Sequence, residues 1–170
     1  PATGAATAAG LLVIGADETQ RQAFVAAGRN DRLSFATLGD DAVEAIAATL
    51  SGLAFERLVW IASRPDTPTL TEEAIIEHQQ RGIVQVMRLA RALERLETHV
   101  TAAPARRDLQ WDLVTVNALP ASAGSPVEPT HAGLQGLTGS MAEVYPGWRI
   151  RMLDVPELSA STIAALLAPG

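Results

Sequence analysis

Three polar residues of this sequence stand where an α/β protein would place its chemistry. Ser63, Asn117 and His131 each lie close to the point where a predicted apolar strand ends. The carboxyl ends of strands form the edge at which open α/β sheets bind ligands. A small enzyme or a nucleotide-binding protein could use this edge. For His131 by itself, a surface or loop-capping role is the simpler interpretation.

The other candidate residues form no recognised catalytic or metal-binding pattern. The histidines, His78, His99 and His131, lie on separate elements and lack the i, i+4 spacing of a helical zinc site. Cysteine is absent, which excludes disulfides, thiolate nucleophiles and cysteine-based zinc sites. Ser63 and Ser140 lack the G-x-S-x-G elbow of a hydrolase. We therefore expect no catalytic residue, no metal and no bound cofactor.

The segment LLVIGADETQ, residues 11–20, has the strand, turn and helix with which a dinucleotide-binding protein begins. A pyrophosphate site needs glycines at fixed offsets, but this turn contains only Gly15. Asp17 and Glu18 place two negative charges at the helix N-terminus, where a phosphate would bind. We expect a capped helix with an empty phosphate position. A Walker-type loop is excluded because it requires lysine, which the chain lacks.

Apolar strands alternate with helical segments along the chain. Strands are predicted over residues 11–15, 32–38, 57–62, 111–117 and 148–153. Helices are predicted over residues 17–28, 40–51, 71–96, 130–144 and 158–167, with Asp17 as an N-cap, Gly28 as a stop and a break near Gly82. This order indicates an α/β fold: a truncated Rossmann-like, doubly wound parallel sheet of about five strands, covered on both faces.

Length and composition favour one domain. The chain has 170 residues, of which 48% are hydrophobic and 4% aromatic. Residues 1–10 are interpreted as a linker and 11–170 as a single Rossmann-like subdomain, cut from a longer polypeptide. The net charge of -6 makes nucleic acid an unexpected partner. No apolar run reaches the roughly 18 residues of a membrane span, and a cytoplasmic location is compatible with the absence of cysteine.

Three further groups of residues have simple packing interpretations. The tryptophans belong to the core or the sheet edge, and they are Trp60, Trp111 and Trp148. Glycines recur at every third residue of one predicted helix, at Gly133, Gly136 and Gly139. This spacing favours close packing of the backbone on a neighbouring element over a partner surface. A charged cluster is most simply a solvated helix face, with a domain contact as the alternative, and it contains Arg88, Arg91, Glu94, Arg95 and Glu97.

The stretch HAGLQGLTGSMAEVYPGWRIRMLDV, residues 131–155, resembles the helix and strand of short-chain dehydrogenases in which a lysine precedes an AG..GLT.S.A pattern. On that pattern His131 stands at the lysine position, and Val127 stands at the tyrosine position four residues earlier. Asn117 lies in the region of the family's catalytic serine. In that family the tyrosine transfers a proton, and the lysine lowers its pKa and holds the nicotinamide ribose. The resemblance therefore implies the fold without this chemistry.

Tyr145 is the only tyrosine of the chain, and Arg149 follows it at the family's spacing of four residues. Pro146 and Gly147 lie between them and break the helix that such spacing requires. This pair is therefore not expected to replace the missing tyrosine and lysine.

From about Leu11 to Leu167 the chain resembles the first half of the ketoreductases of modular polyketide synthases, and EVYPGWRIRMLDV resembles synthases whose acyltransferases act in trans. In that family the first half is a truncated, cofactor-free structural subdomain, and the second half carries the catalytic residues. The resemblance implies a non-catalytic scaffold that braces a catalytic half or neighbouring domains. A stand-alone nucleotide-binding enzyme of the short-chain-dehydrogenase type and a dimerisation element are the alternatives.

Overall fold

The computed structural model describes residues 10–28, 32–63, 71–99, 108–120, 122, 127 and 129–168. Nearly all of the predicted linker, residues 1–10, lies outside these ranges. Within them, no helix is long and apolar enough to cross a lipid bilayer.

A parallel sheet runs through the middle of the molecule. Its strands pair in the order β2-β1-β3-β4-β5, and they span Leu33–Ala36, Leu11–Ile14, Arg57–Ile61, Gln110–Val116 and Arg149–Val155 respectively. All four pairings are parallel. The predicted doubly wound parallel sheet is confirmed, and its strand order is one of the two common in such folds.

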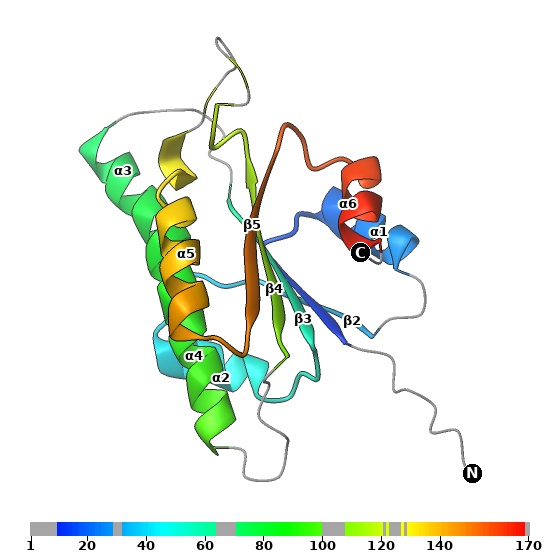
Figure 1. The fold of residues 1–170 in the computed structure, drawn as a ribbon, viewed down its shortest axis with the longest axis vertical. Coiled ribbons are helices and arrows are strands. Elements are labelled where there is room, and N and C mark those ends of the chain that lie inside the picture. Colours follow the sequence, from blue (N-terminus) through cyan, green and yellow to red (C-terminus); the bar gives the residue numbers. More distant parts are fainter. Residues whose placement is uncertain are drawn as a thin grey trace.

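Helices cover both faces of this sheet (Figure 1). On one side α1 (Glu18–Ala27) packs beside α6 (Ala160–Leu167). The other side carries α2, α3, α4 and α5, which span Val43–Leu50, Glu72–Gln79, Gln85–His99 and Leu134–Val144. Successive side chains of a strand point to opposite layers. In β1, Leu12 and Ile14 pack toward α2, α4 and α5, whereas Leu11 and Val13 pack toward α1 and α6.

Local sequence explains where α1 begins and ends. The Asp17 carboxylate accepts from the backbone N–H of Gln20, and the Gln20 side chain accepts from the Asp17 N–H, which completes a capping box. Gly28 ends the helix, and its N–H donates to the carbonyl of Phe24. Both the predicted N-cap and the predicted stop are confirmed.

The long predicted helix contains the expected break. After α3, residues Gln80–Val84 form a π-helical turn with Gly82 at its centre, and α4 then continues to His99. A π turn inserts an extra residue into the helix and shifts the helix face that follows. The apolar stripe of α4, which includes Val86, Leu89 and Leu93, can therefore face the sheet.

The tertiary structure confirms some packing predictions and corrects others. Trp60, Trp111 and Trp148 are buried in the core. The glycine prediction holds only at Gly133, where a β-carbon would lie 2.7 Å from Cδ1 of Ile83. It is wrong at two exposed positions where a β-carbon would have no neighbour within 4 Å, namely Gly136 and Gly139.

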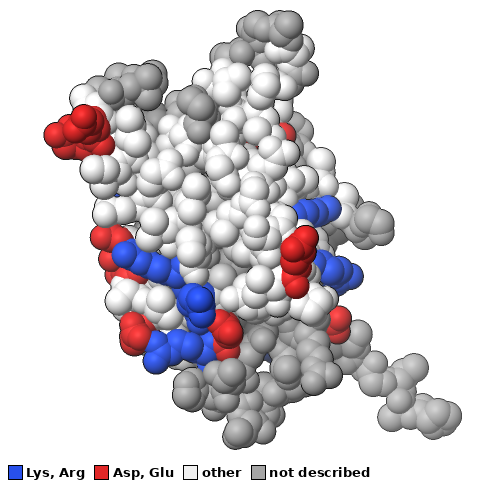
Figure 2. All heavy atoms as spheres, turned by 60° about the vertical axis from the view of Figure 1, so that its left-hand side comes forward, with Lys and Arg blue, Asp and Glu red and all other residues white. Residues whose placement is uncertain are grey.

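The predicted solvated face of α4 is in part a contact between helices. Arg88 pairs with Asp40, and Arg95 pairs with Glu44 of α2, so these two ion pairs link α4 to α2 and the segment before it. Arg91 remains largely exposed and pairs with Glu94 of the same helix. In Figure 2 basic and acidic side chains lie next to one another at the lower left of the molecule.

Candidate functional site

The topology places a candidate site at the carboxyl edge of the sheet. From β1 the chain passes outward to β2 and then returns to the other side of β1 to form β3. Ligands of doubly wound proteins bind where the strand order reverses in this way. Here that point lies between Gly15, which follows β1, and Ser63, which lies just beyond β3.

A tight turn and a capping box follow β1. Gly15 has φ 86°, and a β-carbon there would lie 2.5 Å from the carbonyl oxygen of Ile61, so the turn requires glycine. The Asp17 carboxylate accepts from the Gln20 N–H at 2.8 Å, and the Gln20 side chain accepts from the Asp17 N–H at 3.0 Å. Because these two N–H groups would face a bound phosphate, the capping box competes with it.

His131 closes the same edge beyond β3. The residue is 4% exposed, and Nε2 of its ring lies 2.8 Å from the carbonyl oxygen of Ser63. The ring also stands edge-on to Trp60, and its other side lies against Gly82. The surface interpretation of His131 is therefore wrong, and the loop-capping interpretation is confirmed.

Gln85 extends this buried polar group toward β2. Its side-chain oxygen accepts from Nε1 of Trp60 at 2.8 Å, and its side-chain nitrogen donates to the carbonyl oxygens of Leu38 and Gly39 at 3.0 and 3.1 Å. These bonds tie α4 to β3 and to the loop after β2. The bonds of Gln85 and of His131 Nε2 hold the loops that follow β2 and β3.

Asn117 takes part in a separate cluster after β4. It has φ 53°, and its side chain donates to the carbonyl of Pro156 at 3.1 Å. Asp154 accepts from the backbone N–H groups of Ala118 and Leu119 at 2.8 and 3.0 Å and from the Thr115 hydroxyl at 2.7 Å. Asn117 and Asp154 thus fix the loop that leaves β4 against the loop that leaves β5. Of the three predicted edge residues, the structure joins only His131 and Ser63.

The two residues considered as replacements for the family's tyrosine and lysine lie elsewhere. Tyr145 caps the C-terminus of α5 at the amino end of the sheet, and its ring stacks on Trp148 with centroids 4.2 Å apart. Arg149 begins β5 at that same end. Val127, at the tyrosine position of the resemblance, is exposed. Among the residues that the structure describes, no cluster of three His, Asp or Glu side chains could hold a metal.

Sequence reasoning missed one buried charge. Asp112 in β4 is 0% exposed and accepts from Nε and Nη2 of Arg57 at 3.0 and 2.8 Å. Its other oxygen accepts from Nε of Arg151 in β5. Hydrogen bonding to Asp112 raises the pKa of the Arg151 guanidinium further above neutral pH. An acid inside the apolar strand WDLVTV was the available signal, because a buried carboxylate requires partners.

Comparison with known proteins identifies the chain's relatives. No protein-family model matches it. It is 33% identical over 116 residues to polyketide synthase PksM and 29% identical over 114 residues to polyketide synthase PksN, both of Bacillus subtilis. Polyketide synthase ThaG of Burkholderia thailandensis is 31% identical over 115 residues. The chain is homologous to a segment of polyketide synthases. The matches cover 66% to 68% of the chain but only 2% of each synthase.

Solved structures show which fold this polyketide synthase segment has. A short-chain dehydrogenase from Mycobacterium smegmatis matches with a TM-score of 0.61 at 13% identity, over 95% of this chain and 85% of that one. An oxidoreductase of the same family from Burkholderia thailandensis matches with a TM-score of 0.61 at 19% identity, over 86% of this chain and 68% of that one. The synthase homology and this fold together fit the ketoreductase-like subdomain that the sequence resemblance predicts.

Proposed function

We propose that residues 11–170 form a non-catalytic structural subdomain of a polyketide synthase ketoreductase, which braces a catalytic half or a neighbouring domain. The observation that carries this proposal is the capping box at the start of α1. Asp17 and Gln20 occupy the N–H groups at the position where a Rossmann-like protein binds pyrophosphate. A phosphate would have to displace these bonds and approach the carboxylates of Asp17 and Glu18.

Exposed apolar side chains on the helical layer formed by α3, α4 and α5 support the bracing role. Six large hydrophobic side chains are exposed in the described residues, and four of them belong to α3, α4 and α5: Ile75, Ile76, Met87 and Val144. Gly136 and Gly139 leave one side of α5 open. Figure 2 shows a broad uncharged area on this side of the molecule. Exposed apolar surface of this kind marks protein contacts, and the small fraction of each related synthase that the chain covers leaves ample polypeptide as a partner.

Titration of the chain with NADPH, followed by cofactor fluorescence, tests the absence of nucleotide binding. We expect no saturable binding, whereas a short-chain dehydrogenase with an intact glycine-rich turn should bind under the same conditions. Micromolar affinity for NADPH would overturn the proposal and favour a stand-alone nucleotide-binding enzyme.

Co-expression with a catalytic ketoreductase half of the parent synthase tests the bracing role. Binding should raise the melting temperature and the activity of the catalytic half, because a ligand of the native state stabilises it. Gly136→Arg should abolish this effect, and its β-carbon would meet nothing within 4 Å apart from its own stretch of helix. Val25→Arg is the matched control, because Val25 is exposed on α1, across the sheet. Unchanged melting temperature and activity of the catalytic half would contradict the bracing role.

Light scattering tests whether the chain forms a dimer by itself. A dimer that Gly136→Arg disrupts would instead assign the face to a second copy of the chain.

A further inference from the structure

Strand β5 forms an edge of the sheet as the structure describes it, since it pairs only with β4. The N–H of Arg149 donates to the carbonyl of Leu109, and the carbonyl of Val155 accepts from the N–H of Asn117. In a parallel pair alternate residues direct their backbone groups to the same neighbour. By the same alternation, the N–H and C=O groups of Ile150, Met152 and Asp154 point away from β4. Unpaired groups of this kind can receive a further strand.

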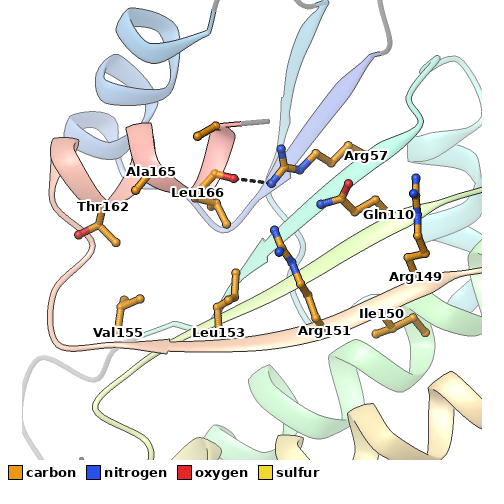
Figure 3. Close-up of a pocket in the computed structure, with 11 residues that line it drawn as sticks. Arg57, Gln110, Arg149, Ile150, Arg151, Leu153, Val155, Thr162, Ala165 and Leu166 are labelled. Atoms are coloured by element: carbon orange, nitrogen blue, oxygen red, sulfur yellow. Dashed lines mark hydrogen bonds between the residues drawn. The ribbon is translucent and has the colours of Figure 1, made fainter. Parts of the chain in front are cut away.

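The side chains of β5 that face α6 line a hollow of about 770 Å³. They occur at every second residue, with basic side chains at one end and apolar side chains at the other. Arg149 and Arg151 lie toward the amino end of β5, and Leu153 and Val155 lie toward its carboxyl end (Figure 3). Ala165 and Leu166 of α6 continue the apolar half. The period of two matches the spacing of side chains along an extended peptide.

The charged half of the hollow carries an excess of positive charge. Three arginines line it, namely Arg57, Arg149 and Arg151. The buried Asp112 beneath them accepts from Arg57 and Arg151. None of the ion pairs among the described residues includes Arg149, whose side chain is exposed. In a chain of net charge -6, this excess selects for an acidic occupant.

A second copy of the chain fits this edge poorly. Parallel pairing of two β5 strands in register would place arginine opposite arginine, which is destabilising. Antiparallel pairing about Met152 would place Arg149 opposite Val155 and Arg151 opposite Leu153, so that no carboxylate would face either arginine. Charged side chains on an edge strand are also a device that prevents pairing between identical chains.

We propose that β5 accepts an extended segment of polyketide synthase polypeptide as an added strand. Such a segment carries carboxylates at two alternate positions, facing Arg149 and Arg151, and apolar side chains at the next two, facing Leu153 and Val155. Backbone pairing with Ile150, Met152 and Asp154 supplies affinity, and the hollow supplies specificity. The hollow lies on the side of the sheet that α6 covers, and the proposed bracing contact lies on the side that α5 covers, so the two proposals can fail independently.

Fluorescein-labelled peptides of seven residues, the length of β5, test the proposal. The first peptide has glutamate at positions one and three, valine at positions five and seven, and threonine between them, and a second has the reverse order. We expect saturable binding of one of the two in an anisotropy titration. Replacement of both glutamates by lysine should abolish that binding. Hydrogen exchange should slow at the N–H groups of Ile150, Met152 and Asp154 when the glutamate peptide binds.

Charge reversal at Arg149 provides the matched variant. Arg149→Glu should lower the affinity for the glutamate peptide by about fivefold or more and raise the affinity for the lysine peptide. Arg91→Glu, a change at another exposed arginine on α4, should alter neither affinity. Equal binding of the glutamate peptide and its lysine version, or binding of the glutamate peptide that is insensitive to Arg149→Glu, would overturn the proposal.

Binding of decanoate that is lost in Arg149→Glu, without binding of any peptide, would instead assign the hollow to a small amphipathic anion. Gly136→Arg should leave peptide binding unchanged, which separates this test from that of the bracing face.

Discussion

The ring of His131 lies directly against Gly82 at the centre of the π turn. A β-carbon at position 82 would come within 2.8 Å of Nδ1 and 3.2 Å of Cε1 of that ring. On its other side, Nε2 of His131 lies 2.8 Å from the carbonyl oxygen of Ser63. One side chain thus joins the break in the long helix to the loop that follows β3.

Substitution of Gly82 tests this close approach. Gly82→Ala should lower the free energy of unfolding by about 1 to 3 kcal/mol, because the buried ring has little room to move. Gly136→Ala is the control: it meets nothing within 4 Å and should raise stability by about 0.5 to 1 kcal/mol through helix propensity. Urea denaturation measures both. Equal effects of the two substitutions would show that the ring does not constrain position 82.

Removal of the imidazole tests the loop cap. His131→Ala should lower the free energy of unfolding by about 2 to 4 kcal/mol, because it leaves a cavity beside Trp60 and removes the hydrogen-bond partner of the Ser63 carbonyl. His78→Ala, a change at a partly exposed position of α3, should have an effect within about 0.5 kcal/mol. Thermal and urea denaturation followed by circular dichroism provide the measurement. A cost for His131→Ala no greater than that for His78→Ala would contradict the assigned role.

Neutralisation of Asp112 tests the buried ion pairs. Asp112→Asn should lower the free energy of unfolding by about 3 kcal/mol, because Arg57 and Arg151 then lose the charge that compensates their own. Asp40→Asn removes the exposed partner of Arg88 and should cost less than about 1 kcal/mol. Denaturant titrations at matched ionic strength compare the two variants, and a similar small cost for both would show that burial of Asp112 adds nothing.

The pH dependence of stability tests the ion pair between α2 and α4. A hydrogen bond from its own backbone N–H, and then the Arg95 guanidinium, hold the pKa of the Glu44 carboxyl below its usual value of 4.5. Around and below pH 4.5 the unfolded state binds more protons than the folded state, so the free energy of unfolding rises with pH. The contribution is present above pH 4.5 and is lost as pH falls through the folded-state pKa. Glu44→Gln should reduce this slope, and an unchanged acid limb of the stability profile would contradict the assignment.

Local patterns were sufficient to predict the elements of the fold. Apolar strands end at Gly15 and Asn117, Asp17 begins a helix and Gly28 ends it, because these preferences act over a few residues. The starts of three helices shifted: α2 begins at Val43 rather than residue 40, α5 begins at Leu134 after a short 3-10 turn, and α6 begins at Ala160 rather than residue 158. In the first case the Asp41 carboxylate accepts from the N–H of Gly39 and stabilises a turn before the helix.

The candidate site was predicted less completely. The absence of catalytic, metal and cofactor residues stays a prediction. The edge residues Ser63 and His131 do meet, but through the Ser63 carbonyl, and Asn117 belongs to another cluster. Asp112 was not singled out, because its significance depends on arginines that lie 55 positions before it and 39 positions after it.

The sequence by itself determined the secondary structure, the parallel α/β class and the absence of a glycine-rich turn after the first strand. Each of these depends on hydrophobic periodicity, capping residues or the residues of a single turn. Only the tertiary structure decided that His131 is buried, that one side of α5 is open at Gly136 and Gly139, and that β5 presents its arginines beside α6. Burial and pairing depend on which distant segments meet across the sheet, and one chain segment read alone does not contain that information.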